Sequence, residues 1–328
     1  MKVGLQIPSY SWSGGDAQIG VRLAELVQAA DEIGFDSIWV MDHFFQIRGV
    51  GRPEEPMLEG WTTLGYLAAL TRRAHLGLMV GGVAYRAPAL WIKAATTLDV
   101  LTGGRAYLGL GAAWNEDEAR SLGFAFPPLS ERFELLEDTL RMAHGMWSGE
   151  RGTDESFQGH RVRAERLLNS PQALRRPHPP ILIGGGGERK TLRLVAQYAD
   201  ATNVFGGPDQ IRHKYDVLRG HCQQVGRNYD EIEKTNLNSF TLDASGRDGE
   251  SRAAARTGLA PPAVTPTQIV QRLGEWAEAG SQHTIFSIRD LDLPKLERMG
   301  HTVVPQAHEI GSATTSAATS ATTIGGLP

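Results

Sequence analysis

The sequence has a single cysteine, Cys222, and no long apolar run. One thiol cannot form an intrachain disulfide, so a reducing compartment fits and cysteine-rich zinc sites are excluded. No stretch approaches the roughly 18 uninterrupted apolar residues of a membrane-spanning helix. The N-terminal segment MKVGLQIPSY holds one lysine and no apolar core, so it does not resemble a signal peptide. These absences predict a cytoplasmic protein.

An excess of one charge is also lacking. The 33 lysines and arginines are interspersed with 37 aspartates and glutamates, which gives a formal net charge of −4. This balance argues against a nucleic-acid-binding surface and against binding to an anionic membrane. Hydrophobic residues make up 41% of the chain, which is ordinary for a globular protein with a sizeable core. We therefore expect a small-molecule substrate.

Several well-known catalytic motifs are missing as well. The sequence has no GxSxG elbow for a nucleophilic serine, and its glycine-rich stretch fits neither the Walker A nor the GxGxxG pattern. Apart from His43, no predicted strand end carries a histidine, cysteine or carboxylate set with ligand spacing, so we expect no metal site. A metal hydrolase is therefore only a minor alternative.

What the chain does have is a regular alternation of strand-like and helix-like segments. Glycine stops one helix at Gly34, Pro88 opens another that closes on Gly103 and Gly104, and Ser130 is placed as an N-cap. The strands are expected at residues 2–7, 37–41, 75–83, 105–113, 179–187, 201–205, 231–242 and 283–288. Several are continuous apolar runs, as in parallel strands that are buried on both faces. Eight such units predict an α/β fold, a (β/α)8 TIM barrel with insertions.

Two segments interrupt the alternation. Residues 150–180 predict an extended excursion with a hairpin, and residues 243–262 predict a small inserted helix. Residues 311–328 are low-complexity Gly, Ala, Ser and Thr, which predicts a flexible tail. We expect one barrel domain over residues 1–310.

Glycines gather where three of the predicted strands end, which is the catalytic face of such a barrel. Four of them, Gly184, Gly185, Gly186 and Gly187, follow a strand and precede a helix, a pattern that favours phosphate or another anion. The small residues of GLGAA at 109–113 indicate either a flat ring lying across the strand end or close packing of the barrel. The pair Gly81 and Gly82 indicates either close approach of a ligand or a bend at a barrel corner.

The second predicted strand delivers Asp42 and His43 into a loop of unusual length. Neighbouring residues on a strand point in opposite directions, so we expect one to contact a ligand and the other to support it. Histidine can transfer a proton near neutral pH. Residues 46–60 are too many for a plain connection, and we expect them to control access to the site.

These segments, in this order, resemble a known family. GFDSIWVMDHF, LGLMVGGV, TLDVLTGGR before GLG, and PPILIGGGGERKTLRLVAQYAD are similar to the bacterial luciferase-like monooxygenase superfamily. They are most similar to its branch of oxidoreductases that depend on the deazaflavin coenzyme F420. The resemblance covers about residues 2 to 300.

The resemblance implies where the coenzyme lies. Its tricyclic ring would occupy the barrel mouth, above a backbone bulge that often holds a non-prolyl cis peptide; here that bulge maps to Gly81, Gly82 and Val83, with the cis bond expected at Gly82–Val83. Its phosphate would lie at residues 184–187. The remaining coenzyme contacts would be Ala113, Trp114, Asn115, Asn203 and Phe205.

The resemblance also assigns the chemistry. His43 matches the histidine that assists proton transfer beside the ring's reactive carbon, and Asp42 matches its neighbour, so both are predicted catalytic residues. Some sugar-phosphate dehydrogenases of the family carry a carboxylate in the fourth-strand motif. Here Trp114 stands in that place and Glu116 comes two residues later. Neither a catalytic glutamate nor a sugar-phosphate substrate is therefore implied.

The resulting hypothesis is an F420-dependent oxidoreductase that transfers a hydride between the coenzyme and a small organic substrate. Five aromatic residues are expected to line an apolar substrate space: Phe44, Phe45, Trp61, Tyr85 and Trp114. An FMN-dependent luciferase-like monooxygenase is the first alternative, and an F420-binding carrier without turnover is the second. The resemblance also admits a homodimer formed through the outer helices.

Overall fold

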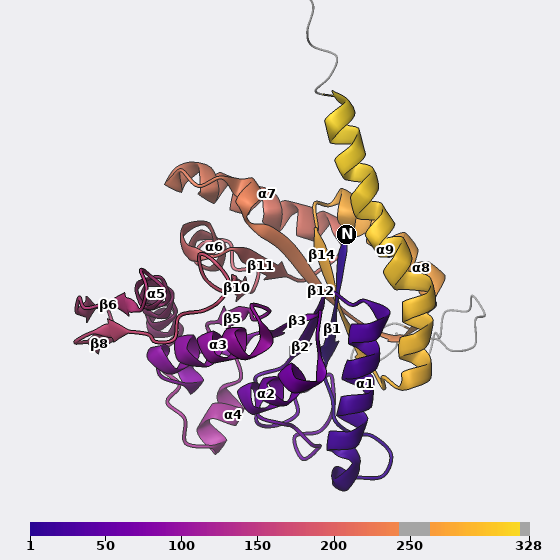
Figure 1. The fold of residues 1–328 in the computed structure, drawn as a ribbon, viewed down its shortest axis with the longest axis horizontal. Coiled ribbons are helices and arrows are strands. Elements are labelled where there is room, and N and C mark those ends of the chain that lie inside the picture. Colours follow the sequence, from indigo (N-terminus) through magenta and orange to yellow (C-terminus); the bar gives the residue numbers. More distant parts are fainter. Residues whose placement is uncertain (243–262, 322–328) are drawn as a thin grey trace, which may run out of the picture.

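Parallel strands form a barrel at the centre of the molecule (Figure 1). The computed structural model describes residues 1–242 and 263–321, with side chains up to residue 310. In the barrel the strands follow the order β3-β2-β1-β14-β12-β11-β10-β5-β4. Their bounds are β1 Lys2–Ile7, β2 Ser37–Val40, β3 His75–Leu78, β4 Gly81–Gly82, β5 Leu108–Gly111, β10 Ile181–Gly184, β11 Ala201–Val204, β12 Glu233–Leu242 and β14 His283–Arg289. The short β13, Ala263–Val264, pairs with β12.

One position of the barrel is shared by two short strands. β3 pairs with β2, and β4 pairs with β5; the two are separated only by Met79 and Val80. A parallel bridge between Leu76 and Ala106 joins β3 to the chain just before β5, so the two ends of the strand order meet. The nine strands thus occupy eight positions, and the predicted TIM barrel is confirmed.

Helices cover the outside of the barrel (Figure 1). They are α1 Ile19–Ile33, α2 Gly60–Leu70, α3 Pro88–Thr102, α4 Glu116–Ser121, α5 Leu129–Met146, α6 Thr191–Tyr198, α7 Pro208–Val225, α8 Pro266–Glu278 and α9 Leu293–Ala321, with short 3-10 turns η1 Asp16–Gln18, η2 Val83–Tyr85 and η3 Tyr229–Glu231. Gly34 and Gly103 end α1 and α3 with φ of 105° and 71°, as predicted. The N-cap prediction at Ser130 was wrong, because α5 is capped by Pro128 and no side chain takes part.

The core has two parts. The larger part packs the outer faces of the strands against the helices. The smaller part fills the barrel and is drawn from strand positions or their immediate neighbours: Trp39, Met79, Tyr107, Leu182, Ala201 and Ile285. Side chains alternate along a strand, so each strand contributes to both parts. The inner filling leaves the upper, C-terminal ends of the strands as the place where a ligand can enter.

The predicted excursion over residues 150–180 contains two antiparallel pairings. β6 Gly152–Thr153 pairs with β9 Leu167–Leu168, and between them β7 Phe157–Gln158 pairs with β8 Arg163–Ala164. The predicted hairpin is therefore confirmed. The inserted helix predicted for residues 243–262 lies outside the described residues. Helix α9 extends to Ala321, into the segment expected to be a flexible tail, whose mobility stays a prediction.

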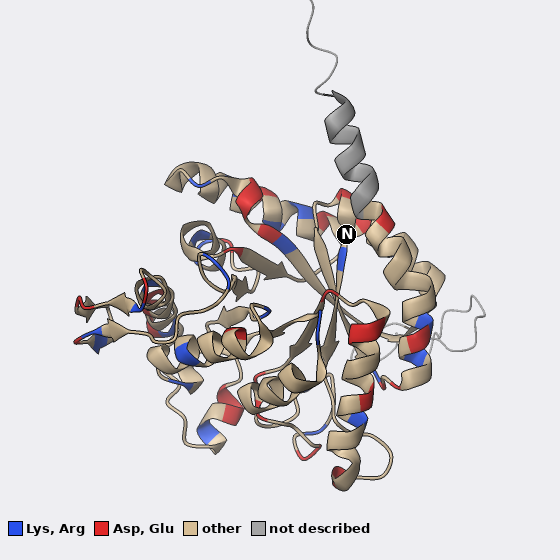
Figure 2. Ribbon diagram, in the orientation of Figure 1, with Lys and Arg blue, Asp and Glu red and all other residues tan. Residues whose placement is uncertain are grey.

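Charged residues of both signs are mixed over the outer helices, while the strands show few of them (Figure 2). In the part of the chain that the structure describes, no helix is long and apolar enough to span a bilayer.

Candidate functional site

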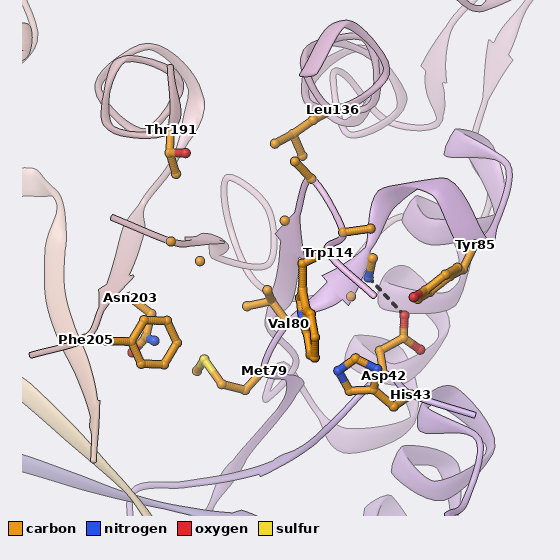
Figure 3. Close-up of a pocket in the computed structure, with 17 residues that line it drawn as sticks. Asp42, His43, Met79, Val80, Tyr85, Trp114, Leu136, Thr191, Asn203 and Phe205 are labelled. Atoms are coloured by element: carbon orange, nitrogen blue, oxygen red, sulfur yellow. Dashed lines mark hydrogen bonds between the residues drawn. The ribbon is translucent and has the colours of Figure 1, made fainter. Parts of the chain in front are cut away.

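A cavity of about 320 Å³ opens at the C-terminal ends of the strands. It is lined by residues at or just after the ends of β2, β3, β5, β10 and β11, by both residues of β4, and by one side chain each from η2, α5 and α6 (Figure 3). The lining residues are Asp42, His43, Met79, Val80, Gly81, Gly82, Tyr85, Gly111, Ala112, Ala113, Trp114, Leu136, Gly184, Gly185, Thr191, Asn203 and Phe205. Parallel strands bring their ends together at one rim, which is why segments far apart in the sequence meet here.

His43 lies on the wall of this cavity and is held from behind by Glu118. The imidazole Nδ1 is 2.9 Å from Glu118 Oε2, and the ring of Trp114 stands edge-on to it with centroids 5.4 Å apart. Glu118 itself does not line the cavity. The carboxylate therefore supports the histidine without facing a ligand.

Glu118 is the most heavily hydrogen-bonded acid of the site. Its Oε1 accepts the backbone N–H groups of Phe44 and Phe45, the latter at 2.8 Å, and its Oε2 accepts the Tyr85 hydroxyl at 3.0 Å as well as His43. Burial opposes its charge, but the bonds from His43 and the two amides outweigh burial and lower the pKa of Glu118. For Tyr85, burial and the Glu118 charge raise the pKa. One ionised carboxylate thus joins three loops of the mouth.

Asp42 is held differently from its neighbour. Its carboxylate receives both Arg86 NH groups, at 2.8 and 2.9 Å, and the Gly82 N–H at 3.1 Å. Arg86 also pairs with Glu59, which caps the start of α2. Burial raises the pKa of Asp42 although Arg86 acts in the opposite direction. Asp42 therefore holds the backbone at Gly82, while the imidazole of His43 is held by Glu118.

The backbone bulge of the third strand lies just below its predicted place. The non-prolyl cis peptide is Met79–Val80, so the bond expected at Gly82–Val83 was wrong. The Val80 side chain projects toward two glycines: a Cβ on Gly184 would lie 2.8 Å from it, and a Cβ on Gly111 would lie 3.0 Å away. Some of the space that these glycines were expected to leave for a flat ring is therefore filled by the Val80 side chain.

Only half of the four-glycine loop reaches the cavity. Gly184 and Gly185 line it, and Gly185 has φ of 122°, which favours glycine. Gly186 and Gly187 do not line it; a Cβ on Gly187 would meet the Thr191 hydroxyl at 2.7 Å. The following helix α6 begins at Thr191, which does line the cavity. Of the loop predicted to bind an anion, the first two glycines therefore lie on the cavity together with Thr191, and anion binding there stays a prediction.

Asn203 is an unsatisfied group in the lining. It is completely buried, and its Oδ1 accepts a hydrogen bond from Thr235 Oγ1 at 2.9 Å. Its Nδ2 has no hydrogen-bond partner among the described residues. A buried donor without a partner costs about 1–3 kcal/mol. A ligand with a carbonyl or phosphate oxygen would remove that cost.

The structure brings together most of the residues predicted for the coenzyme and leaves others apart. Gly81, Gly82, Ala113, Trp114, Asn203 and Phe205 line the cavity with the first two glycines of the loop, whereas Val83 and Asn115 do not. Val83 is buried, and the Asn115 side chain caps α4.

Of the five aromatic residues expected around a substrate, only Tyr85 and Trp114 line the cavity. Phe44, Phe45 and Trp61 do not, and their place beside a substrate stays a prediction; Phe44 packs on Tyr85 and Phe124. No residue of the loop 46–60 lines the cavity either, and its role in access stays a prediction.

Sequence reasoning missed Glu118, although it ends the motif GAAWNEDE that drew attention to Glu116. The signal that could have singled it out is Asn-x-x-Glu, the capping-box spacing. Asn115 does accept the Glu118 N–H, at 3.4 Å. The Glu118 carboxylate, however, turns away from the cap and reaches His43.

Among the described residues no group of three potential metal ligands occurs.

Comparison with known proteins gives the family. The family model for luciferase-like monooxygenases matches residues 1–314. Two relatives named F420-dependent glucose-6-phosphate dehydrogenase, from Nakamurella multipartita and Kineococcus radiotolerans, are 33% and 35% identical over 65% of this chain. The chain covers 61% and 62% of the length of these two relatives.

Solved structures agree on the fold. An F420-dependent secondary alcohol dehydrogenase in complex with an F420-acetone adduct has a TM-score of 0.76 at 15% identity, over 93% of this chain and 98% of that one. A riboflavin lyase with modified FMN also has a TM-score of 0.76, at 12% identity, over 95% and 92%. The barrel, the bulge behind the cavity and the family match point the same way. The chain belongs to the luciferase-like monooxygenase family.

Proposed function

We propose that the protein is an F420-dependent oxidoreductase that transfers a hydride between the deazaflavin and a small organic substrate. The choice of coenzyme is supported by the names of the two relatives that are 33% and 35% identical. The observation that carries the site assignment is the cavity at the barrel mouth. It presents His43 and the unpartnered amide of Asn203 to one space with a glycine-rich wall.

The residues of the cavity fit this coenzyme. Asn203 would donate its free N–H to an oxygen of the bound group, and Gly185 with Thr191 would receive its phosphate. The exposed rings of Trp114 and Phe205 offer flat apolar faces at the rim. The bound deazaflavin supplies the carbon that gives or takes the hydride. His43 would move the accompanying proton, and Asp42 would hold the bulge through Gly82.

The proposed substrate is a small organic molecule. We do not assign to this chain the glucose 6-phosphate that the names of the two relatives specify. Among the described residues that line the cavity there is no lysine or arginine. A sugar phosphate carries a charge that such side chains normally neutralise.

We also propose a cytoplasmic location, consistent with a single cysteine that is buried in α7.

The coenzyme is tested by adding F420 and FMN separately to the purified protein and measuring each affinity by calorimetry. We expect F420 to bind at one site per chain, at least tenfold more tightly than FMN. Tighter binding of FMN would instead support a monooxygenase that activates oxygen, the function suggested by the family's description. Binding of F420 with no turnover of any alcohol, carbonyl or imine tested would support the carrier alternative.

A further inference from the structure

Glu118 and His43 form a pair whose direction of hydrogen bonding is fixed. The Glu118 oxygens already accept two backbone N–H groups and the Tyr85 hydroxyl. The lowered pKa of Glu118 keeps the group ionised, and an ionised carboxylate has no hydrogen to donate. The 2.9 Å contact with His43 Nδ1 is therefore a hydrogen bond only if Nδ1 carries the hydrogen.

The state of the other ring nitrogen, Nε2, follows from this. A neutral imidazole with hydrogen on Nδ1 has a lone pair on Nε2. Among the described residues no side chain or backbone group bonds His43 Nε2, and the ring lines the cavity (Figure 3). The site therefore presents a proton acceptor to whatever occupies the cavity.

We propose that Glu118 is a positioning residue that fixes His43 in the Nδ1–H tautomer, with Nε2 directed into the cavity. The use of this nitrogen in catalysis rests on the proposed function, whereas the tautomer does not. In the oxidation of an alcohol, Nε2 would accept the proton as the O–H bond breaks, and a bound oxidised deazaflavin would supply the acceptor for the hydride that leaves as the C–H bond breaks. The imidazolium that forms is stabilised by Glu118, and in the reverse direction it returns the proton to the carbonyl oxygen.

Replacement of one atom should reverse the tautomer. In Glu118→Gln the amide oxygen can keep the Phe44 and Phe45 N–H groups only if the NH₂ group faces His43. Nδ1 must then accept a hydrogen bond, so the hydrogen moves to Nε2. The cavity would face a donor where the wild type offers an acceptor.

The test is long-range ¹H–¹⁵N NMR of histidine-labelled protein without coenzyme, with His43→Asn used to assign the signal. For the neutral ring, we expect wild-type His43 to show a protonated Nδ1 and an unprotonated Nε2, and E118Q to show the opposite pattern. Glu116→Gln is the matched control, because Glu116 is two residues away on the same helix and, among the described residues, forms its ion pair with Arg120 alone. It should leave the His43 signals unchanged.

Protonation of Nε2 in neutral wild-type His43 would overturn the proposal, and this measurement requires no variant. An unchanged tautomer in folded E118Q would also overturn it. Tyr85→Phe removes one donor from Glu118 but leaves its bond to His43, so the wild-type tautomer should persist. With F420, the rate of alcohol oxidation should fall in E118Q but not in E116Q, because only E118Q loses the acceptor at Nε2. Failure of F420 to bind, with the expected tautomer present, would reject the proposed function alone.

Discussion

The two ends of the barrel each hold a histidine beside a glutamate, fully buried at Glu118 and partly buried at Glu233, and the two histidines differ in the surroundings of the second ring nitrogen. At the mouth, His43 is bonded through Nδ1 to Glu118, and its Nε2 has no partner among the described residues. At the opposite end, His283 Nδ1 lies 3.6 Å from Glu233, and its Nε2 is 2.9 Å from Ser37 Oγ. The first ring presents Nε2 to a cavity with no protein group beside it. In the second ring Nε2 is hydrogen-bonded, and Nδ1, although it has no hydrogen-bond partner among the described residues, lies within ion-pair distance of Glu233.

The surroundings of the two glutamates differ in the same sense. Glu233 also accepts hydrogen bonds from the Lys2 ammonium at 2.7 Å and from the Tyr107 hydroxyl at 2.9 Å. Its negative charge is therefore balanced by a lysine of the protein itself. A cavity of about 470 Å³ lies at this end too, but the basic groups that line it already have partners; His75, for example, accepts a bond from Arg175. His283 also lines this cavity, but a protein group lies beside each of its ring nitrogens, whereas Nε2 of His43 has none among the described residues.

Replacing each histidine in turn is the most direct test of the difference between the two ends of the barrel. For His43→Asn, we expect the rate of hydride transfer to F420 to fall about 10²–10⁴-fold, the usual contribution of a positioned acid or base. Affinity for F420 should change little. The measurement is kcat for F420 reduction with an alcohol that the wild type oxidises.

The control is His283→Asn, measured in the same assay. Its ring does not reach the upper cavity, so kcat should stay close to wild type while the midpoint of urea unfolding falls. A full rate in His43→Asn, or an equally large loss of rate in folded His283→Asn, would contradict the distinction between the two ends.

The ion pair beneath the mouth should matter for stability. Arg86→Ala leaves Asp42 buried without its cation, and loss of one partner of a buried pair costs about 3–5 kcal/mol. We expect the free energy of unfolding in urea to fall by that amount. Arg120→Ala is the matched control: its pair with Glu116 is exposed, and such pairs contribute about 1 kcal/mol or less. Equal losses in the two variants would mean that Asp42 does not depend on Arg86.

At the lower end, the comparison predicts a dependence on pH. Burial opposes the charge of Glu233, but His283 and Lys2 outweigh it and lower the pKa of Glu233. A lowered folded-state pKa gives stability that is present above the unfolded pKa of about 4.3 and is lost as pH falls through the folded pKa. Glu233→Gln should cost about 2 kcal/mol at pH 7, in the range for a charged hydrogen bond.

The measurement is urea unfolding of wild type and Glu233→Gln between pH 7 and pH 2.5. The wild type should lose more stability with acid, so the difference between the two proteins narrows below about pH 4. A difference that stays constant over this range would show that the Glu233 charge does not contribute.

The sequence predicted the barrel because its strands and helices carry strong local signals. The apolar runs, the stop at Gly34 and the helix start at Pro88 depend on residues close in sequence, and all appear in the structure. The mouth was predicted in outline for a related reason: the ends of parallel strands must share a rim. This reasoning placed His43, Gly184 and Asn203 at one cavity.

The sequence does not show which of two similar side chains makes a contact between different loops. Glu116 and Glu118 are both acids on a short helix, and only the packing of three loops sends one to His43 and the other to Arg120. The Val80 side chain lies in space that glycines on two other strands leave open. The pair Glu116–Arg120 is local, but the contact of His43 with Glu118 spans 75 residues, and Val80 meets glycines about 30 and about 100 residues away, so no local pattern encodes these contacts.

Two buried asparagines give the finest test of which groups serve a ligand. Asn203 and Asn236 are both fully buried, each Oδ1 accepts a threonine hydroxyl at 2.9 Å, and each Nδ2 lacks a partner among the described residues. Only Asn203 lines the upper cavity. We expect Asn203→Ala to weaken F420 binding about tenfold, or ~1.4 kcal/mol, because a net hydrogen bond to the coenzyme is lost. Asn236→Ala should leave that affinity unchanged by calorimetry; a similar loss in both would mean that general packing, and not the free Asn203 amide, sets the affinity.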